Sequence, residues 1–526
     1  MTQVEFPSLK WSSEIETANM TISMPSFPDL PLSVSLLQCE TGVICTMQAD
    51  FVADNLTFDS ISIASAVISA PVTISIGDGT QVMIAATTTA EFGGIRTQSA
   101  TAETINLGEF SGANVVIDDT GLRIESEKSS LQLNEVALPG GIASSFAITL
   151  TNTHVNDNAE DIASTFSIDS STVVLTTNDL SWSVPDVFGD LNYSADSLSV
   201  SAEMTTADQS FQTNVMVRQD FATGGGTIAT NDLRIDFGSS KFSQMVSPPP
   251  ASWDISGGTA LLAANLNWQE SDNDVRIFGN ANVTLDDIAA FRNDIVASGL
   301  TTTLNATIDT LLGHKIDPAK LSLELIDVGL PITNVNAEFR IGESLSSVDV
   351  DALSMNVLGG SIYTEPFEFS LEAPANPVII RLESIQLALM KALAEFDSID
   401  IEGSVSGVLP ATVSMDLFTI DKGLLSCDDP GGAIRYHAGD SGEENSQLGL
   451  ATRALSNFEF ETLTSEVTYN ENGDLILGMR MEGVNPEMDP NQPVVLNLNL
   501  ENNVPEMLRS LQATRSIQEI FEKNVN

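Results

Sequence analysis

The last third of the sequence, from about Leu321 to Asn526, is dominated by alternating apolar and polar residues. The clearest run places apolar side chains at every second position, at Val494, Leu496, Leu498 and Leu500. A similar run follows the turn Asn472-Gly473 and holds Leu475, Leu477, Met479 and Met481. Successive side chains of a β-strand point to opposite faces of a sheet, so each run predicts a strand with one apolar and one wet face. A sheet of such strands has to cover its apolar face with something other than water.

The rest of the chain repeats this pattern, after a loop-rich start over residues 1–60. Short alternating runs are separated by turn sequences about every 10 to 15 residues, which predicts a mainly β chain with an elongated, twisted antiparallel sheet extended by hairpins. Three consecutive prolines, Pro248 to Pro250, cannot join a ladder from the interior of a sheet and predict a boundary. We therefore expect four regions, an N-terminal part of the sheet over residues 1–250, its continuation over 251–380, an amphipathic helix over 381–397, and a C-terminal region over 398–526.

Helical patterns are few and favour short helices near the C-terminal end. The best one runs from Leu382 to Phe396, where apolar residues recur at helical spacing, and it predicts a helix that caps an edge or end of the sheet. A weaker helix is expected to start near Asp286. The tail from Asn503 is expected to form two helices with a break near Ser516, which begins a capping box.

The charge of the chain excludes one class of partner. There are 72 acidic and 21 basic residues, for a net charge of -51, and no basic cluster stands out. Nucleic-acid binding needs Lys and Arg to neutralise phosphates, so no nucleic-acid partner is expected. Flat adsorption on an anionic membrane is disfavoured for the same reason. An acidic surface keeps a protein soluble, and that role accounts for most of the excess without a specific site.

Residues suited to catalysis are scarce. The three histidines, His154, His314 and His437, lie in distant segments. The stretch Gly439–Gly442 resembles the surroundings of a serine-protease nucleophile, but the histidine of such enzymes comes from far upstream, whereas His437 is close by. Acidic clusters lack the spacing of a calcium loop, and the glycine-rich stretches lack the Lys and helix of a nucleotide site. The sequence therefore predicts no enzyme, no catalytic residue, no metal and no cofactor.

Two of the three cysteines lie close together. Cys39 and Cys45 flank Thr41-Gly42, which could turn a hairpin, and in an oxidising compartment they predict a disulfide. In the cytosol they would be two free thiols, and both alternatives are open.

No window of the sequence reaches the ~18 consecutive apolar residues of a membrane-spanning helix. The first residues, Met1 to Pro7, have neither the basic nor the apolar region of a signal peptide.

The apolar face has two possible covers. Hydrophobic residues make up 42% of the chain but aromatic ones only 6%, so an apolar lining would be mainly aliphatic and would suit acyl chains better than stacked rings. A curled sheet could hold such chains in a hydrophobic groove or tunnel. A sandwich would instead close the same face into a dry core, as in a structural or adhesive extracellular β protein. The alternation alone leaves both open.

A series of motifs in the C-terminal third favours the groove. In chain order it comprises Gly403–Gly407, Leu409-Pro410, Gly423-Leu424, Pro430–Gly432, Ile434–Tyr436, Leu455–Phe458, Asn472–Leu475, Gly483–Pro486, Pro493-Val494 and Leu496–Asn499. This series resembles the C-terminal portion of the YdbH-like family, among the AsmA-like bacterial proteins of intermembrane phospholipid transport. The resemblance covers about Leu321 to Phe521, and upstream the likeness is one of pattern.

The resemblance implies a passive conduit for phospholipid between the inner and outer membranes of a Gram-negative bacterium, with the lipid tails in the apolar groove. It also implies a periplasmic location, an N-terminal anchor in the inner membrane, and a small outer-membrane lipoprotein that adds strands at the C-terminal end. Because the sequence shows no such anchor, we expect it to be part of a longer chain. From the alternation we expect the groove to be lined by Val348, Val350, Phe367, Phe369, Leu475, Leu477, Met479, Val494, Leu496 and Leu498.

Overall fold

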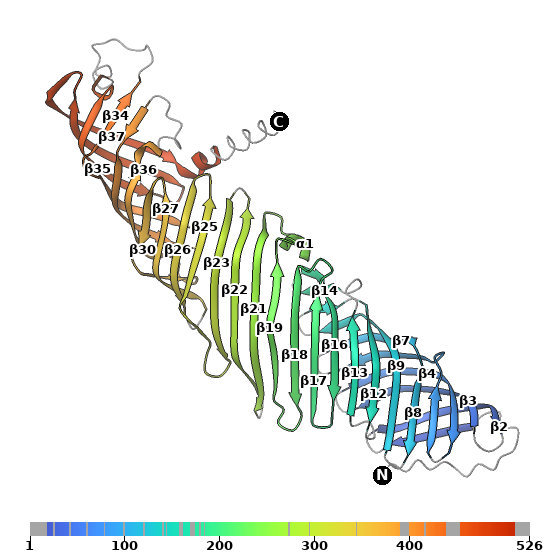
Figure 1. Ribbon diagram of the computed structural model, residues 1–526. Coiled ribbons are helices and arrows are strands. Elements are labelled where there is room, and N and C mark those ends of the chain that lie inside the picture. Colours follow the sequence, from blue (N-terminus) through green and yellow to red (C-terminus); the bar gives the residue numbers. More distant parts are fainter. Residues whose placement is uncertain are drawn as a thin grey trace, which may run out of the picture. The chain divides into compact units, whose positions relative to one another are not determined.

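The computed structural model confirms the mainly β prediction (Figure 1). It describes residues 18–510, apart from breaks at 390–398 and 438–452 and several breaks of one to five residues. The strands belong to one hydrogen-bonded sheet, and neighbours pair antiparallel, from β1 (Ala18–Met24) with β2 (Phe27–Glu40) to β36 (Asp474–Asn485) with β37 (Asp489–Asn503). The structure thus has the antiparallel hairpins that the turn sequences predicted.

The chain divides into two compact units. The first comprises Met1–Pro250, Leu261–Ala281 and Asp309–Leu311, and the second comprises Ala251–Ala260, Asn282–Ile308 and Leu312–Asn526. One limit coincides with the last of the three prolines. However, β21 (Trp253–Ser271) and β22 (Asp274–Arg292) contribute residues to both units, so a module boundary at residue 250 stays a prediction.

The first unit is a meander in which long strands alternate with shorter ones. The long strand β4 (Ile61–Ile76) pairs along its length with β3 (Ile44–Phe58) and on its other edge with two short strands, one after the other. The remaining elements of this unit are β5 (Thr80–Ile84), β6 (Thr89–Arg96), β7 (Thr101–Phe110), β8 (Ala113–Asp118), β9 (Gly121–Asn134), β10 (Val136–Leu138), β11 (Gly141–Ala143), β12 (Phe146–Asn156), β13 (Asp161–Ile168), β14 (Val174–Thr177), β15 (Leu180–Ser183), β16 (Asp186–Tyr193), β17 (Ser197–Thr205), β18 (Phe211–Asp220), β19 (Gly226–Asp236), α1 (Phe242–Met245) and β20 (Val246–Ser247).

The second unit repeats this arrangement. Its strand β27 (Ser347–Val357) pairs on one edge with β26 (Pro331–Ile341) and on the other with two short strands, β28 (Gly360–Thr364) and β29 (Phe367–Ser370). The other strands are β23 (Ile295–Asp309), β24 (Lys315–Ile316), β25 (Ala319–Asp327), β30 (Asn376–Gln386), β31 (Ile399–Glu402), β32 (Ser404–Val413), β33 (Phe418–Cys427), β34 (Gly432–Tyr436) and β35 (Phe458–Tyr469).

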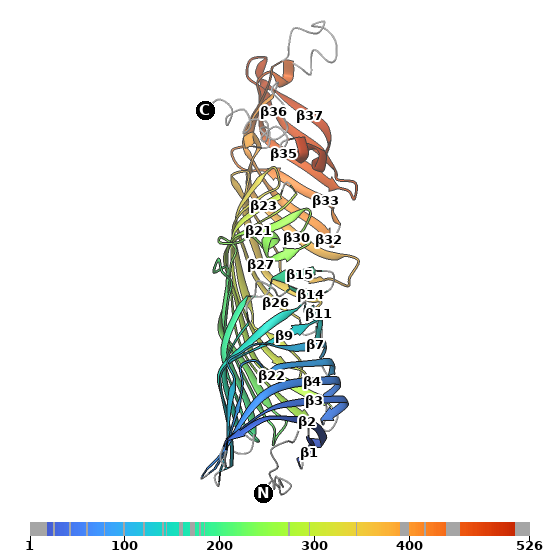
Figure 2. The same cartoon turned by 90° about the vertical axis from the view of Figure 1, so that its right-hand side faces the viewer.

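Many strands contain one residue with positive φ in their interior, and several of these residues coincide with a shift of register. In the second unit, Asn334 in β26, Ser384 in β30 and Lys422 in β33 have φ of 53°, 54° and 54°, and each lies at a register shift against a neighbouring strand. Such β-bulges insert an extra residue, bend the strand and increase its twist. In the first unit Asn55 of β3 has φ of 56°, and Figure 2 shows β3 and β4 curving along their length.

A bulge also explains where the helix prediction at Leu382 is wrong. The residues from Leu382 to Gln386 continue strand β30, and helical residues begin only at Leu387. The extra residue at Ser384 lets Leu382 and Ile385, three positions apart, pair with Gly407 and Val405 of the same neighbouring strand. This spacing imitates one turn of a helix. Residues 390–398, which hold the rest of the predicted helix, lie outside the described chain.

The other helix predictions differ in outcome. The weak helix near Asp286 is wrong, because β22 runs through this position and bends at Asp287, whose φ is 52°. The tail is helical over residues 504–510, and the Asn503 side chain caps it by accepting a hydrogen bond from the Glu506 amide at 3.1 Å. The predicted second tail helix near Ser516 lies outside the described residues.

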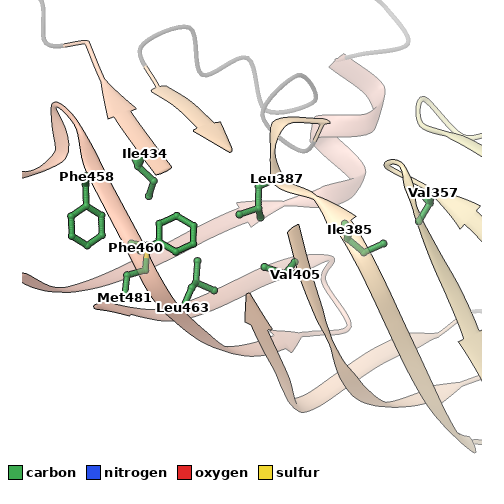
Figure 3. Packing of buried hydrophobic residues seen from close by; sticks show 9 residues of the cluster. All are labelled: Val357, Ile385, Leu387, Val405, Ile434, Phe458, Phe460, Leu463 and Met481. Atoms are coloured by element: carbon green, nitrogen blue, oxygen red, sulfur yellow. The ribbon is translucent and has the colours of Figure 1, made fainter. Parts of the chain in front are cut away.

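Buried apolar side chains concentrate in the second unit. One group, which we call the Phe458 cluster, is drawn in Figure 3 and consists of Val357, Ile385, Leu387, Val405, Ile434, Phe458, Phe460, Leu463 and Met481. Phe458, Phe460 and Met481 are at most 2% exposed. A second group, the Leu477 cluster, consists of Val378, Leu409, Ala411, Ile420, Val467 and Leu477. The clusters found in the first unit hold only two or three buried residues each.

Candidate functional site

The predicted groove residues of the C-terminal strands form rows that cross from strand to strand. The registers of β35, β36 and β37 align Leu463, Met481 and Leu496 in one row. Met479 lies across from Leu498 in the next row, and Val467, Leu477 and Leu500 form a third. Directly opposed side chains of an antiparallel pair are about 4.5–5.5 Å apart at Cβ, so these rows are continuous apolar contacts.

Four further predicted residues form two such rows upstream. Val348 lies between Ile341 of β26 and Phe369 of β29, and Val350 lies between Phe339 and Phe367. Asp349 and Asp351, which alternate with them, are exposed. The register therefore brings the apolar residues of three successive strands onto one face and leaves the carboxylates on the other.

The exposure of these side chains distinguishes a lining from a core. Leu477 is 8% exposed and is part of the Leu477 cluster. The other nine predicted residues are only partly buried. Six of them pack against a cluster, namely Val494, Leu496 and Leu498 on the Phe458 cluster, and Phe367, Leu475 and Met479 on the Leu477 cluster. The face thus combines buried side chains with partly exposed apolar ones that pack against them.

The first unit has an apolar row of the same kind. Leu191, Val200, Val217 and Ile228 are aligned across β16, β17, β18 and β19. The first three are partly buried and Ile228 is 39% exposed. The helical segments among the described residues are short, at α1, 387–389, 453–455 and 504–510, and they are too small to cover such rows. An apolar face that is regular in register yet incompletely buried differs from the closed core of a sandwich.

The opposite face of the second unit carries paired charges. Arg340 donates two hydrogen bonds to Asp351, at 2.7 and 3.0 Å, and this pairing raises the pKa of Arg340. Tyr363 donates a hydrogen bond of 2.8 Å to Glu383, which raises the pKa of Tyr363. Solvent screens such exposed contacts, so they contribute little to stability. Their main effect is to keep this face of the sheet in water.

Groups for chemical catalysis are not assembled in the described part of the chain. His437 lies 2.9 Å from Asp400 through Nε2 and Oδ2, and both side chains are exposed. Ser441, the serine near this histidine, lies outside the described residues. Among the residues that are described, no group of three or more His, Cys, Asp or Glu side chains could hold a metal ion. The main feature of the described rows is therefore their apolar surface.

The predicted disulfide lies at the start of the first unit. The register of β2 and β3 places Cys39 directly opposite Cys45, and Cys45 is disulfide-bonded. The pairing of these two residues stays a prediction. Cys427 is a free thiol, which accepts a hydrogen bond from the Leu463 amide at 3.1 Å.

Sequence reasoning missed the most deeply buried residues of the site. Phe458 and Phe460 form the centre of the Phe458 cluster, with ring centroids 6.4 Å apart. Their alternation with Glu459 and Glu461 was the signal that could have identified them, because it is the same period of two that marks β36 and β37.

Comparison with known proteins identifies the family. The family described as "YdbH-like: Intermembrane phospholipid transport protein YdbH" matches residues 46–526, which is nearly the whole chain. No curated protein and no solved structure matches it. This is a lipid-transport family of the cell envelope and not a family of enzymes. In the part of the chain that is described, no helix has the length and hydropathy needed to cross a membrane. From the extent of the family match, the chain belongs to the YdbH-like family of intermembrane phospholipid transport proteins.

Proposed function

We propose that this chain is a passive conduit for phospholipid between the inner and outer membranes of a Gram-negative bacterium. The observation that carries the proposal is the incompletely buried apolar face, with rows that continue from strand to strand in both units. Acyl chains lie on this face, and headgroups remain in water. Nothing has to be cleaved or transferred chemically, which agrees with the scarcity of catalytic groups.

The energy of moving a lipid through water explains why such a surface is useful. A phospholipid carries two acyl chains of about 15 methylenes each, and each methylene gains about 0.8 kcal/mol on leaving water. Full desorption therefore costs on the order of 20 kcal/mol. A continuous apolar row lowers this barrier, because each methylene that leaves one contact enters another.

We propose that a hydrophobic groove is lined by the ten residues that the alternation predicts, of which nine are partly buried and Leu477 is 8% exposed. The strand bends at the positive-φ residues support a curled sheet, because bulges are the usual means of curving antiparallel strands. The alternative of a structural or adhesive protein predicts a closed core and no bound lipid. The buried residues of the Phe458 and Leu477 clusters have the burial that this alternative requires throughout, whereas nine of the ten predicted groove residues remain partly exposed.

The partner that the family resemblance implies is a small outer-membrane lipoprotein. We propose that it adds strands to the free edge of β37 at the C-terminal end of the chain. Among the described strands, β37 pairs only with β36, and alternate residues along its 15-residue length direct their backbone groups to the other edge. An unpaired edge of this length presents a row of free backbone N–H and C=O groups. We also propose that the intact protein works in the periplasm and is attached to the inner membrane by an N-terminal anchor.

Site-specific photocrosslinking in cells tests the lipid path. A benzophenone amino acid at Leu496 or Met479 is expected to trap phospholipid, which mass spectrometry identifies. The same label at Asn497, the exposed neighbour of Leu496 on the opposite face, is the matched control. Trapping at Asn497 but not at Leu496 would show that the side chains of β37 are assigned to the wrong faces of the sheet. A register error of one residue would have this effect. Absence of lipid at all three positions would refute the conduit.

A further inference from the structure

Three segments of the second unit meet at one end of its strands and line an open apolar pocket. Leu330 precedes β26, Leu358 lies in the turn between β27 and β28, and Leu389 follows β30. The first two segments are adjacent because Ile332 pairs with Val357. The third joins them through a hydrogen bond of 3.0 Å from the Gln386 amide to the Leu358 carbonyl. The pocket has a volume of about 490 Å³.

The lining of the pocket separates an apolar interior from a neutral polar rim. Leu330, Pro331, Val357, Leu358 and Leu389 form its apolar part, and Leu330, Val357 and Leu358 also contact or belong to the Phe458 cluster. Thr333, Asn356 and Ser361 supply hydroxyl and amide groups, and the lining contains no charged residue. Leu330, Val357 and Leu358 therefore connect the pocket to the Phe458 cluster, and the lining holds no cation that would neutralise a phosphate.

The backbone at Leu358 is unusual for this kind of turn. Leu358 and Gly359 have φ of 49° and 71°, and they connect paired residues Val357 and Gly360 as a two-residue hairpin turn. Turns with two positive-φ positions favour Asn or Gly, because a bulky side chain is strained there. The leucine at this position places an apolar side chain at the pocket wall, where such a turn more often carries Asn or Gly.

We propose that this pocket holds the end of one acyl chain of a phospholipid. The proposal rests on the proposed function and specifies a resting place on the path. Its volume lies in the range of about 300–1,000 Å³ that small-molecule sites occupy. The aliphatic walls suit a flexible hydrocarbon chain, and the neutral donors at the rim suit ester carbonyl oxygens. The headgroup remains in solvent. A lipid with one tail in the pocket is held at a fixed point while its other tail stays on the apolar face.

Photoreactive lipids test the pocket. Vesicles containing phosphatidylethanolamine with a diazirine at the end of one acyl chain are mixed with the 526-residue chain, irradiated and mapped by peptide mass spectrometry. The chain-end probe is expected to label the peptides that contain residues 357–361 and Leu389, as well as those that contain residues 475–498. A second probe with the diazirine on the headgroup is expected to leave the pocket peptides unlabelled.

Variants that fill the pocket supply the control. Leu389→Trp places a large ring in the pocket from a residue that is already 42% exposed, and Thr333→Phe does so from another wall. Each is expected to reduce chain-end labelling of the pocket roughly tenfold while labelling of residues 475–498 persists. The matched control Leu424→Trp changes a leucine that is 64% exposed outside the pocket, and it is expected to leave pocket labelling unchanged.

The outcomes separate this inference from the function on which it rests. Labelling of residues 475–498 without labelling of the pocket overturns the inference and leaves the conduit intact. Labelling of the pocket by the headgroup probe, or equal labelling in Leu389→Trp and Leu424→Trp, also overturns it. Absence of labelling anywhere on the chain refutes the conduit, and the pocket with it.

Discussion

A carboxylate on the apolar face should block lipid movement, whereas the same charge one residue away should not. Leu498 is partly buried, packs against the Phe458 cluster and lies across from Met479. Its neighbour Asn499 is exposed on the other face, across from Gly478. The variants Leu498→Asp and Asn499→Asp add the same charge to the same strand and differ only in the face that receives it.

The magnitude follows from the area that one side chain occupies. Strands are about 4.8 Å apart, and residues of one face repeat about every 6.8 Å along a strand. With carbon–carbon bonds of about 1.5 Å, an acyl chain that crosses this patch has about five methylenes on it. Five methylenes that lie over a hydrated carboxylate lose at most about 4 kcal/mol of their free energy of transfer out of water. Because the face is only partly buried, about half of this applies, so a barrier increase of about 2 kcal/mol slows passage roughly 30-fold.

Transfer of a fluorescent phospholipid between donor and acceptor vesicles measures this rate. Leu498→Asp is expected to slow transfer by this factor and Asn499→Asp to leave it within about twofold, with thermal unfolding followed by circular dichroism as the control for folding. An equal effect of the two variants would refute the assignment of faces. An unchanged rate in Leu498→Asp would refute the idea that lipid tails pass over β37.

Other predictions concern the packing and the charges of the chain. Phe458→Ala removes a fully buried ring, so it should destabilise the second unit by about 3–5 kcal/mol, seen as faster hydrogen exchange in β35. Hydrogen bonds from Asn503 and Asn470 hold the pKa of Asp474 below its ordinary value, so the turn before β36 should keep this stabilisation above about pH 4 and lose it as pH falls through the lowered pKa. Asp474→Asn should remove that pH dependence of exchange. The net charge of -51 should slow transfer of anionic phosphatidylglycerol relative to phosphatidylethanolamine at low salt, and the difference should shrink as the Debye length falls from about 30 Å at 0.01 M to about 8 Å at 0.15 M. Mass spectrometry without reduction should find Cys39 linked to Cys45, and two free thiols there would refute that pairing.

The alternation of apolar and polar residues predicted the strands well where the register was regular. In β36 and β37, the period of two placed Met479 and Leu498 opposite each other and the neighbouring asparagines on the exposed face. Period alone could not predict how deeply each residue is buried. Leu477 and Met479 share a face of one strand, yet Leu477 is a core residue and Met479 is partly exposed, because burial depends on the strands that pack behind them.

The failures of prediction occur where a bulge interrupts the period. At Ser384 and Asp287 one residue adopts a positive φ, and the side chains that follow change face. A pattern search interprets this change as helical spacing, although the backbone remains extended. The pocket at Leu358 was equally hidden, since it depends on three segments that are far apart in the sequence.

The local pairing of the strands has a consequence for how the protein is made. Most strands pair with partners that follow within one or two elements of the chain, as β25 does with β26 and β35 with β36. Loop closure over such short separations is entropically inexpensive, so each hairpin can form as soon as its second strand is available. The chain can thus acquire structure progressively from one end. Loss or duplication of a hairpin would also leave the pairing of distant strands unchanged, so the number of strands is free to change during evolution.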